Sequence, residues 1–558
     1  MKGQRTSIYN SSGYTDTQDM FLAIPIVMVA APVSAAGAAI TPLAGFSNTM
    51  TLKPNFQTLI HSAELVGSGK TIHDVQSHIA MYNGFKMMSG MTTSDLAQWG
   101  SSLGLGNELE SEKSAVWNAT AAAAGTRQSG VGFCLNRAAV SATQGGSDTM
   151  NLVDATGQNA GAINKSLQRR MSRVIDTTLN NAGYNRIYGT STANNLTLLT
   201  ADQLSREFKP YYTTVAGRGI WYDVAICPLK YLFSAMGSIG LTKRSDFVVR
   251  LYLNTGTLQV AITDAQLATQ GLGAISTNTF QNAVPFTINH IPSANNGFPT
   301  ATVATSLVCG VFVAKALPTS ITCNGGQIDL STGVGSHFLQ SCRVYYSQVK
   351  LAPAIETSYA LENRQKQVVY ENVMFNQYNA IAPAQNFAQL VSSGVKDPLY
   401  CLIIPLIGPQ TLTTFGSTVA TIGLEQWQSC YDTCGGGQSF SPLSLTSLNV
   451  SLGGVNVLSG ANLNYTFENF LEQVSQAESF SGLELAGLSI GTINQAWWET
   501  VGRVYFVDLS RNRRADKNAM KSLSISFTNN SNAVITLLVY TVYADKLVID
   551  VETGLITK

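Results

Sequence analysis

The sequence predicts a mainly β protein made of two β-rich units, with inserted helices and long loops. Residues 343–558 run through short apolar or alternating segments such as RVYYSQVKL, KQVVYENVMF and DPLYCLIIPLI, separated by turns of Asn, Gly, Ser and Pro. Runs of this length between turn residues are typical of β-sandwich strands. The length of 558 residues also exceeds what one hydrophobic core organises, at roughly 100–200 residues per domain.

The content of charged residues indicates a chain that buries much of its surface against other copies of itself. Charged residues make up 12% of the sequence, against about 25% in a typical globular protein. Because charge is depleted in the cores of protein interfaces, an assembling subunit needs less of it than a free monomer. Self-association is therefore the first function class that the composition favours.

A change of pattern places the boundary between the two units near residue 355. The segment LAPAIETSYALENRQKQ contains Pro353 and a short charged stretch, after which the strand-like runs resume. We predict an N-terminal arm over 1–55, a first β unit over 56–355 with helical and loop insertions, and a second β unit over 356–558. Residues 264–340, rich in Gly, Thr, Asn and Ser, are predicted to form long surface loops.

Two strand predictions are specific enough to be tested. Apolar residues alternate over 247–254 and again over 258–262 around a Thr-Gly-Thr turn, which predicts an antiparallel hairpin. The C-terminal segment AVITLLVYTVY is apolar on both faces, which predicts a central strand buried on both sides.

A long apolar segment lies near the N-terminus. Residues 20–52 carry no charge, and FLAIPIVMVAAPVSAAGAAI is apolar enough to suggest a membrane span. Pro25, Pro32 and Gly37 interrupt the segment, and the polar, slightly acidic residues before it differ from the basic start of a signal peptide. We therefore predict an extended arm that packs on its own or a neighbouring subunit. Contact with an internal membrane stays an open alternative.

The charge balance and the cysteines argue against two classes of protein, those that bind nucleic acid through a basic surface and those built on a disulfide scaffold. The net charge is +1, and no basic arm or stripe opens the chain, so we expect no sequence-specific binding of nucleic acid. Eight cysteines in a chain of this length do not form a disulfide scaffold. Several lie in apolar runs such as SLVCGVF, where a free Cys acts as a small hydrophobic residue. We therefore expect assembly in a reducing compartment.

Candidate chemical motifs are few and incomplete. The segment GSGKT at 67–71 resembles a phosphate-binding loop, but Glu64 stands where that motif needs a Gly, so we predict a turn. His73 and His78 flank Asp74, yet a spacing of five aligns two imidazoles on neither a helix nor a strand face. Cys430 and Cys434 lack the second ligand pair of a metal site. We predict no catalytic, cofactor-binding or metal site.

The most basic stretch is RNRRADKNAMK, between two predicted strands. A solvated loop is the simplest interpretation, and a surface that contacts a partner protein or a packaged genome is the alternative. The candidate residues of that surface are Arg511, Arg513, Arg514 and Lys517.

A collinear series of segments resembles the double jelly-roll major capsid proteins. The segment NFAQLVSSGVKDPLYCLIIPLIG at 386–408 is similar to those of the virophage, polinton-like virus and adintovirus type, in the lineage of adenovirus hexon. RVYYSQVKLAPAIETSYA precedes it. LTSLNVSLGGVNVLSGANLNYTFENFLEQVSQ, WWETVGRVYFVDLSRNRR and SLSISFTNNSNAVITLLVYTVYADKLVIDVETG follow. In the first half, TIHDVQSHIAMYNGFK and DVAICPLKYLFSAMGSIGLTKRSDFVVRLYLNTG also look similar. Residues 1–55 and 100–185 do not match.

This resemblance implies two eight-stranded jelly rolls side by side, in a structural protein that is not an enzyme and needs no cofactor. It implies a homotrimer with a pseudo-hexagonal footprint that tiles an icosahedral virus shell, with penton and minor capsid proteins as further partners. The location would be the virion, assembled inside the host cell, with loops in 264–340 and 409–445 facing outward. Two alternatives stay open: a secreted β-sandwich adhesin or lectin, and a β-rich hydrolase that uses Asp74 and His78.

Overall fold

The protein is described from a computed structural model. The structure describes residues 3–8, 13–33, 47–52, 56–92, 94–95, 175–176, 211–215, 218–261, 275–280, 284–291, 306–323, 326–331, 340–407, 410–414, 417–422, 443–458, 464–480, 489–491, 493–500, 503–511, 519–531 and 534–558.

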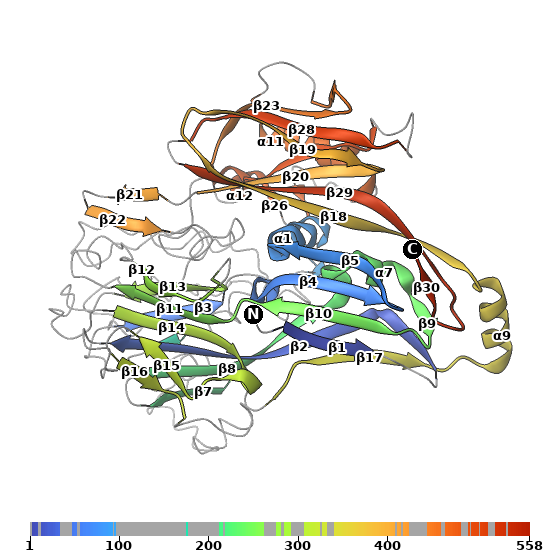
Figure 1. Ribbon diagram of the computed structural model, residues 1–558, viewed down its shortest axis with the longest axis horizontal. Coiled ribbons are helices and arrows are strands. Elements are labelled where there is room, and N and C mark those ends of the chain that lie inside the picture. Colours follow the sequence, from blue (N-terminus) through green and yellow to red (C-terminus); the bar gives the residue numbers. More distant parts are fainter. Residues whose placement is uncertain are drawn as a thin grey trace.

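Eight strands of the C-terminal half form two packed sheets with the strand order of a jelly roll. One sheet has the order β18 (Lys366–Ile381), β29 (Ile535–Ile549), β20 (Pro398–Ile407) and β27 (Tyr505–Asp508). The other has the order β19 (Asn386–Val395), β28 (Lys521–Asn529), β23 (Leu445–Leu452) and β24 (Val455–Asn456). Counted along the chain, these orders are 1-8-3-6 and 2-7-4-5, which is the double Greek key of a jelly roll. Figure 1 shows this unit at the top of the molecule.

Aromatic side chains join the two sheets of this unit. Tyr378 of β18 lies edge-on to Phe387 of β19 at 5.2 Å, and Phe387 stacks on Phe527 of β28 at 4.9 Å. Helix α11 (Phe467–Gln476) begins with a capping box formed by Thr466 and Asn469, and it buries its apolar face against the same core.

The N-terminal half repeats the same order with its strands 2 to 8. One sheet has the order β1 (Gly3–Ile8), β10 (Phe247–Leu253), β4 (Ile60–Gly67) and β5 (Lys70–Ser77), equivalent to 2-7-4-5. In the other sheet, β2 (Tyr14–Val33) has β8 (Arg218–Pro228) on one edge. On its other edge lie β14 (Ser306–Val313) and then β17 (Arg343–Val349), equivalent to 8-3-6. The chain is therefore two jelly rolls, joined through helix α9 (Pro353–Glu362) at the right of Figure 1.

Shorter elements decorate this frame. They are η1 (Phe56–Leu59), β3 (Ser47–Leu52), α1 (Ile79–Gly90), β6 (Ile175–Asp176), β7 (Tyr211–Val215), α6 (Leu229–Leu232), α7 (Ser234–Ile239), β9 (Leu241–Lys243), β11 (Gly256–Ala261), β12 (Ile275–Asn278), β13 (Phe286–Ile291), η5 (Ala314–Ala316), β15 (Ser320–Cys323), β16 (Gly326–Asp329), β21 (Gln410–Thr414), β22 (Ser417–Ile422), η7 (Glu478–Phe480), β25 (Ser489–Ile490), β26 (Ile493–Asn494), α12 (Gln495–Thr500) and β30 (Ile556–Thr557). Strands β12 to β16 lie within residues 264–340, where the sequence predicted loops, and much of 264–340 and 409–445 lies outside the described residues.

The apolar N-terminal segment forms the central strand of a sheet, so the prediction of an arm over 1–55 is wrong for the described part. Alternate residues of β2, among them Leu22, Ile24 and Ile26, pack into the main core. The intervening residues, such as Val27 and Val29, pack into a second apolar cluster on the other face of the sheet. Burial on both faces explains why the segment carries no charge. Among the residues that the structure describes, no helix is long and apolar enough to cross a membrane.

The other strand predictions had mixed outcomes. The apolar C-terminal segment forms β29, which lies between β18 and β20 as expected of a central strand. The predicted turn at 67–71 is a tight hairpin between β4 and β5, with Ser68 and Gly69 at φ 48° and 75°. The predicted hairpin over 247–262 is wrong: both strands exist, but β10 pairs with β4 and β1, whereas β11 pairs with β14 and β12 in the other sheet.

Candidate functional site

Helix α1 of the first jelly roll inserts into the aromatic core of the second. The ring of Phe85, which is fully buried, lies 6.0 Å from the rings of Phe480 and Phe506 and 6.4 Å from that of Phe470. Aromatic pairs at these separations gain energy beyond the area they bury. This contact fixes the position of one jelly roll relative to the other.

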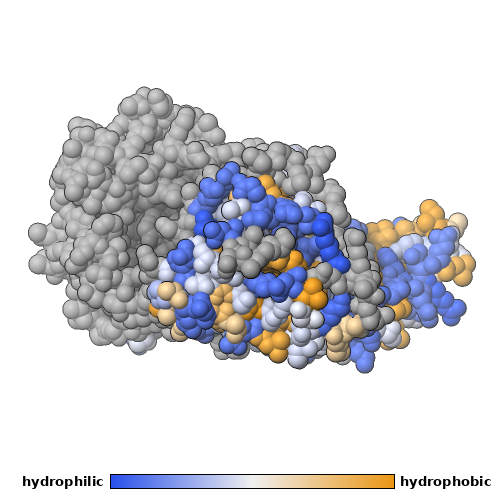
Figure 2. All heavy atoms as spheres, turned by 90° about the horizontal axis from the view of Figure 1, so that it is seen from above, coloured by the Kyte–Doolittle hydropathy of each residue, from blue (hydrophilic) through white to orange (hydrophobic). Residues whose placement is uncertain are grey.

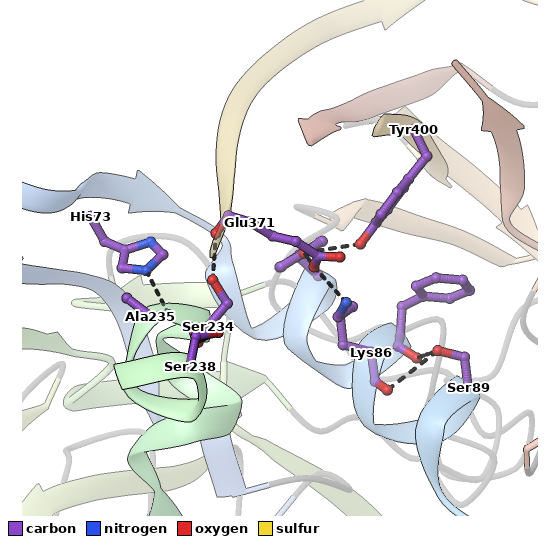
Figure 3. A network of polar contacts seen from close by, with 10 residues as sticks. His73, Lys86, Ser89, Ser234, Ala235, Ser238, Glu371 and Tyr400 are labelled. Carbon is purple, nitrogen blue, oxygen red and sulfur yellow. Dashed lines mark hydrogen bonds and ion pairs between the residues drawn. The ribbon is translucent and has the colours of Figure 1, made fainter. Parts of the chain in front are cut away.

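A polar network lies next to this helix and spans the same junction (Figure 3). Glu371 of β18 accepts a hydrogen bond from Lys86 Nζ at 2.6 Å and one from the Tyr82 hydroxyl at 3.4 Å. The hydroxyls of Tyr82 and Tyr400 lie 3.0 Å apart, and the Ser234 hydroxyl donates to the main-chain carbonyl of Glu371. Burial, and then the nearby Glu371 carboxylate, raise the pKa of both tyrosines well above 10. The phenols therefore stay protonated and keep the network intact at neutral pH.

A small cavity adjoins the network. Its volume is about 150 Å³, and its lining includes His73, Asn83, Lys86, Ser234 and Glu371. A space of this size holds a few water molecules. Its lining residues take part in contacts between the jelly rolls, which gives the cavity a structural explanation.

The two histidines singled out from the sequence are both buried, His73 within β5 and His78 between β5 and α1. His73 Nε2 accepts a hydrogen bond from the Ala235 amide at 3.3 Å, and its ring lies against Phe233. His78 lies against Phe375 and, edge-on, against His61. Burial is the main cause that lowers the pKa of His73 to about 3 and that of His78 to about 4.

These surroundings give no support to the hydrolase alternative. Both imidazoles are neutral at pH 7 and are embedded among aromatic rings, whereas Asp74 is exposed. In the part of the chain that the structure describes, no group of three or more His, Cys, Asp or Glu side chains could hold a metal ion.

The cysteines of the described residues are free thiols. They are Cys227, Cys309, Cys323, Cys342 and Cys401. Burial raises the pKa of Cys227 and of Cys401 to about 12, which makes these two thiols unreactive at neutral pH. Cys430 and Cys434 lie outside the described residues.

Of the four candidate residues of the basic loop, only Arg511 is described. Arg511 follows β27, its side chain is exposed, and its Nε lies 3.9 Å from Asp508 Oδ2. Arg513, Arg514 and Lys517 lie outside the described residues. A role of this loop in partner or genome contact stays a prediction.

The C-terminal turn of the second jelly roll also rests on the first. The Ser68 hydroxyl donates to the Gly554 carbonyl at 3.1 Å, and the Tyr370 hydroxyl donates to the Ile72 carbonyl at 2.9 Å. Lys558 pairs with Asp545 at 2.7 Å and donates to the same Ile72 carbonyl at 3.3 Å. These contacts join the last residues of the chain to strand β5 and the turn before it.

We expect Gly554→Ala to loosen this contact. Gly554 has φ +71°, and a Cβ there would lie 2.5 Å from main-chain atoms of Arg244 and Ser245. Gly69→Ala is the matched control, because Gly69 has φ +75° but no atom within 4 Å of its Cβ position. Left-handed strain alone costs about 1 kcal/mol in both variants, so Gly554→Ala should lose clearly more unfolding free energy in urea. Equal losses would contradict a tight approach at Gly554.

Comparison with known proteins gives likenesses to solved structures only. No family model matches the sequence, and no curated protein matches it. The cryo-EM structure of the Sputnik virophage aligns with a TM-score of 0.40 at 12% identity, covering 100% of this chain and 89% of that chain. The mavirus major capsid protein aligns with a TM-score of 0.35 at 9% identity, covering 100% and 86%. The faustovirus major capsid protein aligns with a TM-score of 0.30 at 10% identity, covering 98% and 90%. The assignment of the fold therefore rests on the strand order of this chain itself.

Proposed function

We propose that this chain is a major capsid protein, a non-enzymatic subunit that forms pseudo-hexagonal homotrimers in an icosahedral virus shell. The observation that carries the proposal is the repeated strand order: one chain holds two jelly rolls of the same topology, fixed side by side by α1 and the C-terminal turn. Three such chains around one axis present six similar barrels. A three-fold object with a nearly six-fold outline can tile a flat facet.

The chemistry of the described residues supports a role in assembly. The candidate catalytic histidines are buried and neutral, and the polar network at the junction joins the two jelly rolls to each other. A chain with 12% charged residues has little electrostatic repulsion to oppose close packing of its copies. Burial of apolar and neutral polar surface would drive symmetric association.

We place the protein in the virion shell after assembly in a reducing compartment of the host cell, with penton and minor capsid proteins as neighbours. The basic loop that begins at Arg511 is the proposed contact for such a neighbour or for the genome. The five free thiols of the described residues support a reducing compartment.

The native mass of the purified protein tests the proposal. We expect light scattering on a sizing column to give a mass near three times 59.6 kDa, or multiples of that unit. Negative-stain images of the same fraction should show a hexagonal outline. A monomer that stays monomeric at micromolar concentration, with intact β structure by circular dichroism, would count against the capsid trimer.

A further inference from the structure

The cavity beside the polar network lies between the two jelly rolls and reaches the surface. Its walls come from β4, β5, α1 and the α6–α7 segment of the first jelly roll and from β18 of the second. Asp74 and Lys230 line it and are exposed, so the volume of about 150 Å³ is open to solvent on their side. Figure 3 shows the inner part, where His73 lies on one side of Glu371 and Lys86 on the other. A molecule in this space would contact both jelly rolls.

One buried polar group in the wall of this cavity lacks a partner. Asn83 of α1 lines the cavity and is only 2% exposed, and its Nδ2 has no hydrogen-bond partner among the described residues. Burying an amide N–H without an acceptor is unfavourable, because the group has given up its hydrogen bonds to water. The contacts between the jelly rolls explain where the cavity lies, but they leave this donor unsatisfied. An acceptor atom inside the cavity would satisfy it.

Other polar side chains of the wall are already paired with each other or with the protein around them. Glu371 Oε2 accepts hydrogen bonds from Lys86 Nζ at 2.6 Å and from the Tyr82 hydroxyl at 3.4 Å. Asn372 Nδ2 donates to Asp545 Oδ2 at 3.3 Å. The ion pair between Lys86 and Glu371 also balances the charge of the inner wall. An anion in the cavity would face the Glu371 carboxylate, and a cation would face the Lys86 ammonium group.

Apolar side chains form much of the remaining wall. They are Ala63, Ile79, Leu232, Phe233 and Val373. A buried water molecule needs two to four polar partners, so water beside these side chains is poorly bonded. An apolar group that displaces poorly ordered water gains affinity, and a cavity of about 150 Å³ can hold a molecule of the size of benzene. The interior therefore suits an apolar body better than a cluster of waters. Figure 2 shows that hydrophobic and hydrophilic side chains also alternate on the outer surface, without one dominant apolar face.

We propose that this cavity binds a compact neutral molecule, an apolar ring or short chain with one oxygen atom that accepts a hydrogen bond from Asn83 Nδ2. The occupant lies between α1 of the first jelly roll and β18 of the second. Because it binds the folded junction and not the unfolded chain, it stabilises the junction by mass action. All of the lining residues belong to one chain, so the inference does not depend on the proposed capsid function.

Three small probes of similar size test the chemistry of the site. N-methylpyrrolidone is neutral and carries one carbonyl oxygen, protonated N-methylpyrrolidine is the corresponding ring as a cation without that oxygen, and cyclopentanecarboxylate is an anion. We expect N-methylpyrrolidone to bind the full-length protein saturably, with a Kd of about 1 mM or below. The two charged probes should bind at least tenfold more weakly. Saturation-transfer NMR over a concentration series measures the binding of all three.

Two substitutions in the wall locate the bound probe. Asn83→Leu keeps the side-chain volume but removes the N–H donor, so N-methylpyrrolidone should bind at least tenfold more weakly. This variant should still fold, because it also removes the unsatisfied buried donor. Ala63→Leu fills the cavity, since Ala63 lines it and is 3% exposed, and should abolish binding. Asn456→Leu is the matched control, because Asn456 is exposed on β24, and it should leave binding unchanged.

Each outcome supports or overturns the inference. Saturable binding of the neutral probe that both wall variants reduce supports it. Binding that survives Asn83→Leu, or charged probes that bind as tightly as the neutral one, would overturn a neutral acceptor at Asn83. Binding that survives Ala63→Leu would place the probe outside the cavity and overturn the site. A cavity that holds water only would give no saturation with any probe up to about 10 mM, which would also overturn it.

Discussion

Replacing Phe85 by Ala is expected to lower the free energy of unfolding by about 3–5 kcal/mol, which is typical when a buried phenylalanine is truncated in a packed core. The cost should reach the top of this range because the ring contacts three aromatic rings of the other jelly roll, those of Phe470, Phe480 and Phe506. Since Phe85 is fully buried, the vacated volume cannot be filled by solvent-exposed side chains. Urea unfolding followed by tryptophan fluorescence and by circular dichroism measures the loss.

The same variant should also uncouple the two jelly rolls. In a variant whose other five tryptophans are replaced by Phe, the fluorescence of Trp498, buried in the second jelly roll beside Phe470, should then change at a different urea concentration from the total β signal. Phe85→Leu is the control: it keeps most of the volume and should cost less than about 1.5 kcal/mol with a single transition. If Phe85→Ala unfolds in one transition close to wild type, helix α1 does not couple the two units.

The sequence was informative about strands and much less so about which strands pair. Alternation identified β10 and β11 correctly, but a short link between two alternating runs also suits strands that cross from one sheet to the other. In this chain Asn254, at the link, donates through its main-chain N–H to the Leu59 carbonyl and through its side chain to the Thr58 carbonyl. These hydrogen bonds join residues far apart in the sequence, and they hold the link so that β11 enters the sheet that contains β2. The local sequence pattern does not predict them.

The segment that forms β2 shows a second limit of prediction from sequence. Its apolar composition agrees with a membrane segment, a packed arm or a strand buried on both faces. What separates these interpretations is the division of its side chains between two clusters, with Leu22 and Ile24 in one and Val27 and Val29 in the other. That division depends on elements far along the chain, such as the hairpin of β15 and β16, whose residues Ile321 and Ile328 belong to the second cluster. Sequence periodicity alone could not supply it.

The junction between the jelly rolls was also missed at the level of the sequence. A signal existed in helix α1, where Met81, Tyr82 and Phe85 recur at helical spacing directly after the two histidines. The same spacing is also typical of a helix that packs within its own domain, so the pattern does not reveal that α1 enters the second jelly roll.

Stability should fall steeply between pH 6.5 and about pH 4.5, because His73 and His78 are buried in their neutral forms. Unfolded histidine titrates near 6.5, whereas burial lowers the pKa in the folded chain to about 3 and about 4. Well above pH 6.5 the two histidines are neutral in both the folded and the unfolded chain, so their protonation does not lower the free energy of unfolding. Below it, only the unfolded chain binds protons, and each histidine costs about 1.4 kcal/mol per pH unit. Two histidines over two pH units therefore remove roughly 5 kcal/mol, a large share of the stability of a typical domain.

A paired substitution isolates the two histidines from other acid-sensitive groups. In His73→Gln the side-chain carbonyl can still accept the Ala235 amide hydrogen bond, and in His78→Asn the new residue tolerates φ 53°. The double variant should have a flatter dependence of unfolding free energy on pH between 6.5 and 4.5, whatever its stability at pH 7. His61, whose pKa burial also lowers, would account for the remaining slope in that range.

The Asp545 carboxylate titrates at lower pH than the range of this test. Burial alone would raise the pKa of Asp545, but its ion pair with Lys558 lowers it below 3.8, so its contribution is lost only under stronger acid. Urea titrations at pH 7.0, 6.0, 5.0 and 4.5 on both proteins suffice, since the prediction concerns a difference in slope. If wild type loses no stability over this range, or if the double variant loses as much, the imidazoles are not held neutral by burial. The confirmed slope would mean that mild acid destabilises the folded chain through its buried histidines.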